Sequence, residues 1–179
     1  MSLVSLSSRK FAIMVSHGFD ETAFIAIQKM LLAQNIVLKI ISPNAGLVNG
    51  VSGGQVAMSY PVDTCFNEVL AIDFDALIIP AGETHIASLS DELHSVRIVR
   101  AFMRERMPIL VQDNALDMVG EIIPDIDVAA IKAQGEVGHE GNLYWASSDA
   151  PSDVVGRGFF EYCSTYLQDI AQKNNSAAA

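Results

Sequence analysis

Short apolar segments alternate along this chain with segments in which apolar residues recur at helical spacing. Apolar residues occupy most consecutive positions of each segment, and each segment ends at a turn of Gly, Pro or polar residues. This pattern is typical of a strand covered on both faces. Helical periodicity follows and predicts helices beginning near Asp20, Ser90 and Ser152, with Asp20 as an N-cap. Alternation of this kind predicts an α/β fold with a mainly parallel sheet and helices on both faces. The four apolar segments are 11–16, 37–42, 75–79 and 109–111.

Weaker patterns occupy the rest of the chain. Residues 47–48 and 55–58 flank a glycine-containing turn and predict a short hairpin outside the main sheet. Residues 128–131 and 143–146 predict two further strands. A helical pattern also follows directly after residue 113.

Composition restricts the function classes. The chain has 179 residues, of which 50% are hydrophobic and 18% charged, enough for one real core. Its net charge of −10 argues against nucleic acid and anionic membrane surfaces as partners. No apolar run approaches the roughly 20 residues that span a bilayer. We therefore expect a single cytoplasmic domain over 1–179, disordered at 1–8 and 174–179.

Cysteine and histidine spacing indicates neither a metal site nor a disulfide. Cys65 and Cys163 are far apart in the sequence, and the four histidines show no H-x-x-x-H spacing. We expect two buried thiols, no metal and no cofactor.

The most informative segment is 108–116, Pro-Ile-Leu-Val-Gln-Asp-Asn-Ala-Leu, in which a strand pattern runs into a helix pattern. Such an elbow lifts one side chain clear of the sheet and often presents a nucleophile, here Asp113. One interpretation is that Asp113 caps the following helix. The other is a catalytic carboxylate assisted by Asp20, Glu21 or His17, which follow the first strand at the sheet edge where ligands bind.

Two more segments bear on a pocket at that edge. Gly18 follows the first strand, and Glu83 and His85 follow the turn 80–82, so we expect all three at the pocket rim. The arginines after residue 96 have helical spacing in part and are expected to form the solvated face of their helix. They are Arg97, Arg100, Arg104 and Arg106.

Four segments, in this order and spacing, resemble motifs of the ThiJ/PfpI superfamily. The resemblance covers about residues 9–172 and implies a flavodoxin-like three-layer sandwich, as in class I glutamine amidotransferases. The matching segments are 18–21 (family G-F-E-E), 75–82 (D-A-L-V-L-P-G-G), 108–116 (P-V-A-A-I-C-H-G-P) and 141–143 with 147–148 (G-N-L-I-T-S).

The resemblance also implies a departure from the family's chemistry. Active members use an elbow Cys followed by His, with a Glu from the first turn, but this chain has Asp113, Asn114 and Ala23 at those positions. It further implies that backbone N–H groups of Ala81, Gly82 and Asn114 could form an oxyanion-type site. A narrower likeness, over 9–20 and 39–43, is to the C-terminal domain of large-subunit catalases, which also lacks the Cys.

Three functions follow as hypotheses. The first is a non-catalytic domain with a binding, chaperone-like or structural role, working as a homo-oligomer, most simply a dimer. The second is a small-molecule hydrolase or hydratase that uses Asp113. The third is a ligand-sensing domain. Any small-molecule ligand stays unidentified.

Overall fold

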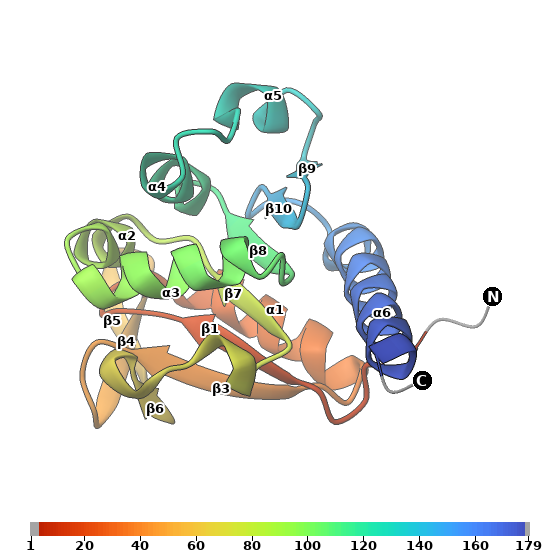
Figure 1. The fold of residues 1–179 in the computed structure, drawn as a ribbon. Coiled ribbons are helices and arrows are strands. Elements are labelled where there is room, and N and C mark those ends of the chain that lie inside the picture. The colour runs from red at the N-terminus through yellow and green to blue at the C-terminus, as the bar shows by residue number, and fades with distance from the viewer. Residues whose placement is uncertain (1–3, 178–179) are drawn as a thin grey trace.

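A computed structural model describes residues 4–177. The strands form a seven-stranded sheet in the order β6-β3-β1-β7-β8-β10-β9, and a three-stranded sheet in the order β2-β4-β5 (Figure 1). The main sheet is parallel except for β9, which runs antiparallel to β10. The strands are β1 (Lys10–Met14), β2 (Phe19–Asp20), β3 (Val37–Ser42), β4 (Leu47–Ser52), β5 (Gln55–Pro61), β6 (Thr64–Cys65), β7 (Ala76–Ile79), β8 (Ile109–Gln112), β9 (Val137–Glu140) and β10 (Leu143–Ala146).

Helices cover both faces of the main sheet, so the three-layer prediction is confirmed. Alternate side chains of β1 divide between two cores: Phe11 and Ile13 pack toward α1 and α6, and Ala12 and Met14 toward α2, α3 and α4. The helices are α1 (Glu21–Ala33), η1 (Phe66–Glu68), η2 (Ala71–Asp73), α2 (Glu83–Ser90), α3 (Leu93–Arg104), α4 (Ala115–Ile122), α5 (Val128–Lys132) and α6 (Ser152–Ala177).

The predicted strands are largely in place. The four buried segments are β1, β3, β7 and β8, adjacent and parallel, and residues 143–146 form β10 beside β8. The 47–58 hairpin is also confirmed: β4 and β5 pair antiparallel outside the main sheet.

One element prediction is wrong, and the start of one helix is displaced by two residues. Residues 128–131 lie in helix α5 instead of a strand, because the Asp127 carboxylate accepts the Ala130 N–H and closes a helical turn. The helix predicted to begin near Ser90 is capped by Glu92, whose side chain accepts the His94 N–H. A separate helix, α2, ends at Ser90.

The ends of the chain are more ordered than expected in the part that the structure describes. Leu6 is buried and packs against the α1–α6 side of the sheet. Residues 174–177 continue α6, the long helix at one side of the sheet (Figure 1). The expected disorder at residues 1–3 and 178–179 lies outside the described residues.

Candidate functional site

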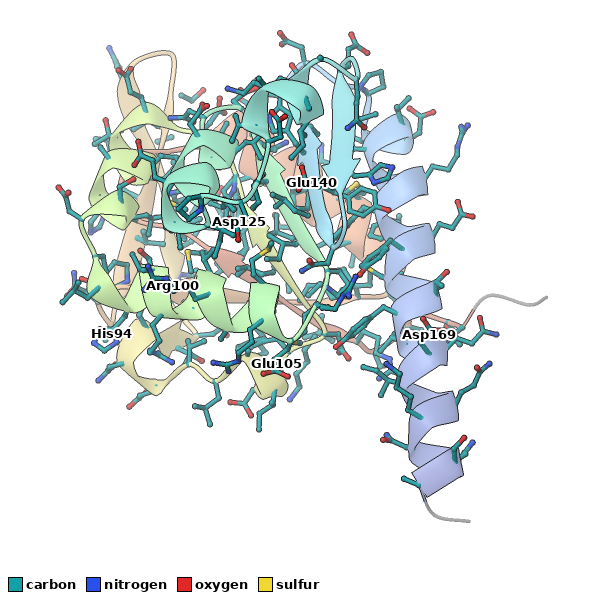
Figure 2. All side chains as sticks on the ribbon, turned by 45° about the horizontal axis from the view of Figure 1, so that its top comes forward. His94, Arg100, Glu105, Asp125, Glu140 and Asp169 are labelled. Carbon is teal, nitrogen blue, oxygen red and sulfur yellow. The ribbon has the colours of Figure 1, made fainter. Side chains whose placement is uncertain are left out.

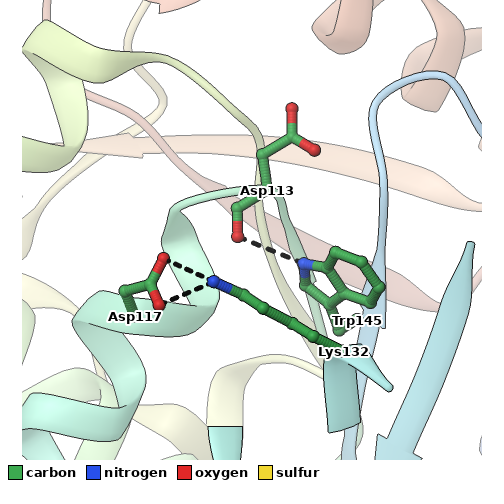
Figure 3. A network of polar contacts seen from close by, with 4 residues as sticks. All are labelled: Asp113, Asp117, Lys132 and Trp145. Carbon is green, nitrogen blue, oxygen red and sulfur yellow. Dashed lines mark hydrogen bonds and ion pairs between the residues drawn. The ribbon is translucent and has the colours of Figure 1, made fainter. Parts of the chain in front are cut away.

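Asp113 forms the elbow between β8 and α4. Its φ is +43°, in the left-handed region that Asp tolerates better than most residues. Its N–H donates to the Ala146 carbonyl at 3.1 Å, and its carbonyl accepts the Trp145 indole N–H at 3.1 Å (Figure 3). The strand β10 therefore holds the elbow backbone through both of its polar groups.

The Asp113 carboxylate does not cap α4. Its Oδ1 accepts the backbone N–H of Ser148 at 2.9 Å, and the N-cap of α4 is Asn114, whose side chain makes no cap bond. Figure 3 shows the carboxylate directed away from Trp145 and Lys132. The cap interpretation is therefore wrong, because the left-handed backbone directs this side chain to the loop after β10.

The three candidate partners of Asp113 are bonded elsewhere. The Asp20 carboxylate accepts the Ala23 N–H at 3.0 Å, which confirms Asp20 as the N-cap of α1. The His17 Nδ1 accepts the Asn49 N–H at 3.2 Å. Among residues 4–177, no hydrogen bond or ion pair joins Asp113 to Asp20, Glu21 or His17.

Glu21 is the buried acid of this region. Its Oε1 accepts the Met58 N–H at 3.0 Å and the Tyr60 O–H at 2.8 Å, and so links α1 to β5. Burial, together with the hydrogen bond to Glu21 and its negative charge, raises the pKa of Tyr60 to about 12. Glu21 therefore stabilises the hairpin, and its polar partners are groups of the protein itself.

The expected oxyanion donors are only partly available. The family resemblance implied that the Ala81 N–H could hold an oxyanion. In the structure this N–H instead donates to the side-chain oxygen of Gln112 at 3.4 Å. Gly82 has a φ of +143°, and a Cβ there would lie 2.8 Å from the backbone nitrogen of Asp20. The turn after β7 thus packs directly on the turn after β1.

Gln112 and Ser148 are site residues that the sequence did not predict. Gln112 could have been found, because it is the one polar residue at the end of an otherwise apolar strand, Ile109–Gln112. Ser148 lies in a segment that resembles a family motif, but nothing there indicated a contact with Asp113, since Ser148 contributes only its backbone N–H.

His85 is fully buried, so its predicted place at the pocket rim is wrong. Its Nδ1 accepts the Ser16 N–H at 3.3 Å, and its Nε2 bonds the Pro80 carbonyl at 2.7 Å. The second bond requires the proton on Nε2, which fixes the neutral tautomer. Burial lowers the pKa of His85 to about 4. Helix α2 places this ring inward, whereas Glu83 on the same helix is exposed.

A hollow of about 410 Å³ lies at the carboxyl ends of β1 and β3. Ser16, His17 and Thr84 are among its lining residues, and Asp113 is not. Within residues 4–177, no three His, Cys, Asp or Glu side chains are grouped as a metal ion would require. No helix in that range has both the length and the apolar composition needed to cross a membrane.

The fold and the elbow define a flavodoxin-like α/β domain whose strand-to-helix turn carries a carboxylate. The model of the DJ-1/PfpI family matches residues 9–111, which is more than half of the sequence. The chain belongs to the DJ-1/PfpI family.

Particular relatives agree with this assignment. The chain is 23% identical to catalase HPII of Mycobacterium avium over 116 residues, which are 64% of this chain and 16% of that catalase. It is 27% identical to general stress protein 18 of Bacillus subtilis over 101 residues, covering 56% of this chain and 57% of that protein. The chain thus spans only part of the length of the curated relatives it matches. The structure of oxidized DJ-1 from Toxoplasma gondii superposes with a TM-score of 0.70 at 14% identity, covering 93% of this chain and 97% of that one.

Proposed function

We propose that this chain is a non-catalytic DJ-1/PfpI domain, a pseudoenzyme with a binding or structural role that works through self-association. The observation that carries the proposal is the state of the elbow: the position of the nucleophile holds Asp113, whose carboxylate is bonded to Ser148 within the chain. A thiolate nucleophile, which this class of chemistry needs, is absent from that position.

The surrounding groups support the same conclusion. A carboxylate that acts as a general acid or base near neutral pH needs a raised pKa, which burial or a neighbouring acid provides. The carboxylates of Asp20 and Glu21 are bonded to other partners, and Ala81 gives its N–H to Gln112. A protease or amidase activity of the kind found on similar scaffolds therefore has no support from the residues of this elbow.

Exposed apolar side chains on the hairpin support self-association. Leu47, Val56 and Met58 are 59%, 74% and 64% exposed on β4 and β5. Val56 and Met58 lie two residues apart on β5, and neighbouring exposed apolar side chains are typical of interaction surfaces. Cys65 and Cys163 are free thiols, which agrees with the reducing cytoplasm that we propose as the compartment.

The test of the catalytic part is an assay for peptidase, amidase, glyoxalase and deglycase turnover. The wild type, Asp113→Ala and the iodoacetamide-treated protein are compared. We expect no turnover above the buffer rate in any sample. Turnover lost in Asp113→Ala would replace the proposal with the hydrolase hypothesis, and turnover lost on alkylation would place a nucleophile at Cys65 or Cys163.

The test of the assembly is light scattering over a range of protein concentration. We expect a mass near twice the monomer's 19.3 kDa. The variant Met58→Glu should shift the mass toward the monomer, and Leu32→Glu, at an exposed leucine on α1, is its matched control. A monomer mass for the wild type at every concentration contradicts self-association.

A further inference from the structure

The outer face of α3 and the short helix η2 enclose a groove of about 630 Å³, which we call the α3 groove. Its walls combine large apolar side chains with arginines, a combination found nowhere in the elbow. The residues that define it are Leu70, Ile72, Leu93, Arg97, Arg100 and Arg104.

The apolar part of the α3 groove is open to solvent. Leu70, Ile72 and Leu93 are 54%, 82% and 83% exposed. Single exposed apolar residues are common on protein surfaces, but several that line one hollow with charged residues beside them are typical of an interaction site.

The charged part forms a row along α3. Leu93, Arg97, Arg100 and Arg104 follow each other at spacings of four, three and four residues, which places them on one helix face. The opposite face is buried through Ser95, Ile98, Val99 and Phe102. Figure 2 shows Arg100 on this helix between His94 and Glu105 at its two ends.

The three arginines differ in their freedom to bind. Arg97 is held in place, because its guanidinium donates to the Phe66 and Val69 carbonyls at 2.7 and 3.1 Å. Arg104 donates to the neighbouring carboxylate of Glu105 at 2.9 Å. Arg100 makes no side-chain hydrogen bond or ion pair with any residue from 4 to 177, so its five donors are available to a partner.

The charge balance selects the kind of partner. The chain carries 11 Lys and Arg and a net charge of −10, yet the charged residues along the whole lining of the α3 groove are its three arginines and one acid, Glu105. Arginine pairs with carboxylates through two parallel hydrogen bonds, which makes an acidic partner the complementary one.

We propose that the α3 groove binds a short acidic segment of another protein, with large apolar side chains of that segment seated between Ile72 and Leu93 and its carboxylates on Arg100 and Arg104. A second copy using the same groove is disfavoured, because a two-fold contact would bring the two arginine rows against each other. Nucleic acid is disfavoured by the acidity of the whole chain.

The experiment selects binders from a display library of random short peptides on the full-length protein. Peptides that bind the double variant Ile72→Ser, Arg100→Glu are removed first. The affinities of the remaining peptides for the wild type and the variants are then measured by fluorescence polarisation. We expect enriched peptides that combine Asp or Glu with Leu, Ile or Phe, and affinities that fall as salt is added. Arg100→Glu and Ile72→Ser should each weaken binding roughly tenfold or more.

Arg157→Glu is the matched control, since Arg157 is an exposed arginine on α6 outside the α3 groove. It should leave the affinity unchanged, and circular dichroism should show all variants folded. Failure to enrich any peptide, enrichment of peptides without acidic residues, or equal affinity for Arg100→Glu and the wild type would each overturn the proposal. None of these outcomes depends on the elbow, so the proposed function is tested separately.

Discussion

The side-chain oxygen of Gln112 lies 3.4 Å from the backbone nitrogen of Ala81, and both residues are buried. This bond joins the end of β8 to the turn after β7. The Ala81 N–H, which the family resemblance implied as an oxyanion donor, thus already has an acceptor within the protein.

Removing that acceptor should destabilise the fold. Gln112→Leu leaves the buried Ala81 N–H without a partner, and we expect the free energy of unfolding to fall by about 1–3 kcal/mol. Urea unfolding measures the difference, with Gln55→Leu on the exposed start of β5 as the control. Equal losses in the two variants would show that the Gln112–Ala81 bond contributes nothing specific.

Asp113 should be replaceable by Asn but not by Ala. Asn retains an oxygen for the Ser148 N–H and tolerates the left-handed backbone, so Asp113→Asn should be nearly neutral. Asp113→Ala loses both properties and should cost about 1–2 kcal/mol. Thermal melts of the two variants decide the matter, and a higher melting temperature for Asp113→Ala than for the wild type contradicts a structural role.

His85 should make the fold sensitive to acid. Its pKa is about 4 in the folded protein against an ordinary 6.5, so the unfolded chain takes up a proton first as the pH falls. The stability it contributes is complete above pH 6.5 and is lost on the way to pH 4, a change of about 3 kcal/mol. Urea unfolding across this range should show a smaller loss for His85→Gln, whereas His94→Gln, at an exposed histidine, should follow the wild type.

Tyr60 should give the opposite dependence at alkaline pH. Its pKa of about 12 lies above the ordinary 10, so the folded state keeps the proton longer than the unfolded state. The stability from Tyr60 is complete below pH 10 and is lost as the pH rises through 12. Tyrosinate absorbance of the wild type minus that of Tyr60→Phe isolates this group. In the Glu21→Gln variant the midpoint of the Tyr60 titration should fall but stay above pH 10, because burial is the larger cause of the raised pKa.

Gly82→Ala tests the contact between the two turns. The new Cβ would lie 2.8 Å from the Asp20 nitrogen and the Phe19 Cα, and backbone atoms cannot give way as a side chain can. We expect a loss on the order of 4 kcal/mol or more, in the exceptional range for one substitution. Gly54→Ala is the control, because Gly54 also has a positive φ but nothing lies within 4 Å of its Cβ position. Its cost should be about 1–2 kcal/mol.

The fold was largely predictable because its signals are local. A strand buried on both faces, such as Phe11 to Met14, is apolar at consecutive positions, and Asp20 is a common capping residue at the start of a helical pattern. The error at residues 128–131 has the same origin. Val, Ala, Ala and Ile suit a strand or a buried helix equally, and one capping bond from Asp127 decides between them.

The site was less predictable because its contacts are between distant residues. Nothing near Asp113 in the sequence indicates Ser148 as its partner, and nothing near Glu21 indicates Met58 or Tyr60. His85 follows a turn and so suggested an exposed position, but helix α2 begins at once and directs the ring inward. These positions depend on packing between elements, which hydrophobic periodicity does not describe.

The left-handed backbone of Asp113 has a consequence for how this scaffold can change over time. The conformation is held by the Ala146 carbonyl and the Trp145 indole, and neither bond involves the Asp113 side chain. The shape of the elbow is therefore inherited separately from the group that it presents. Selection can exchange the presented side chain one substitution at a time, and a lineage can lose a chemistry, or acquire one, while the geometry that served it persists.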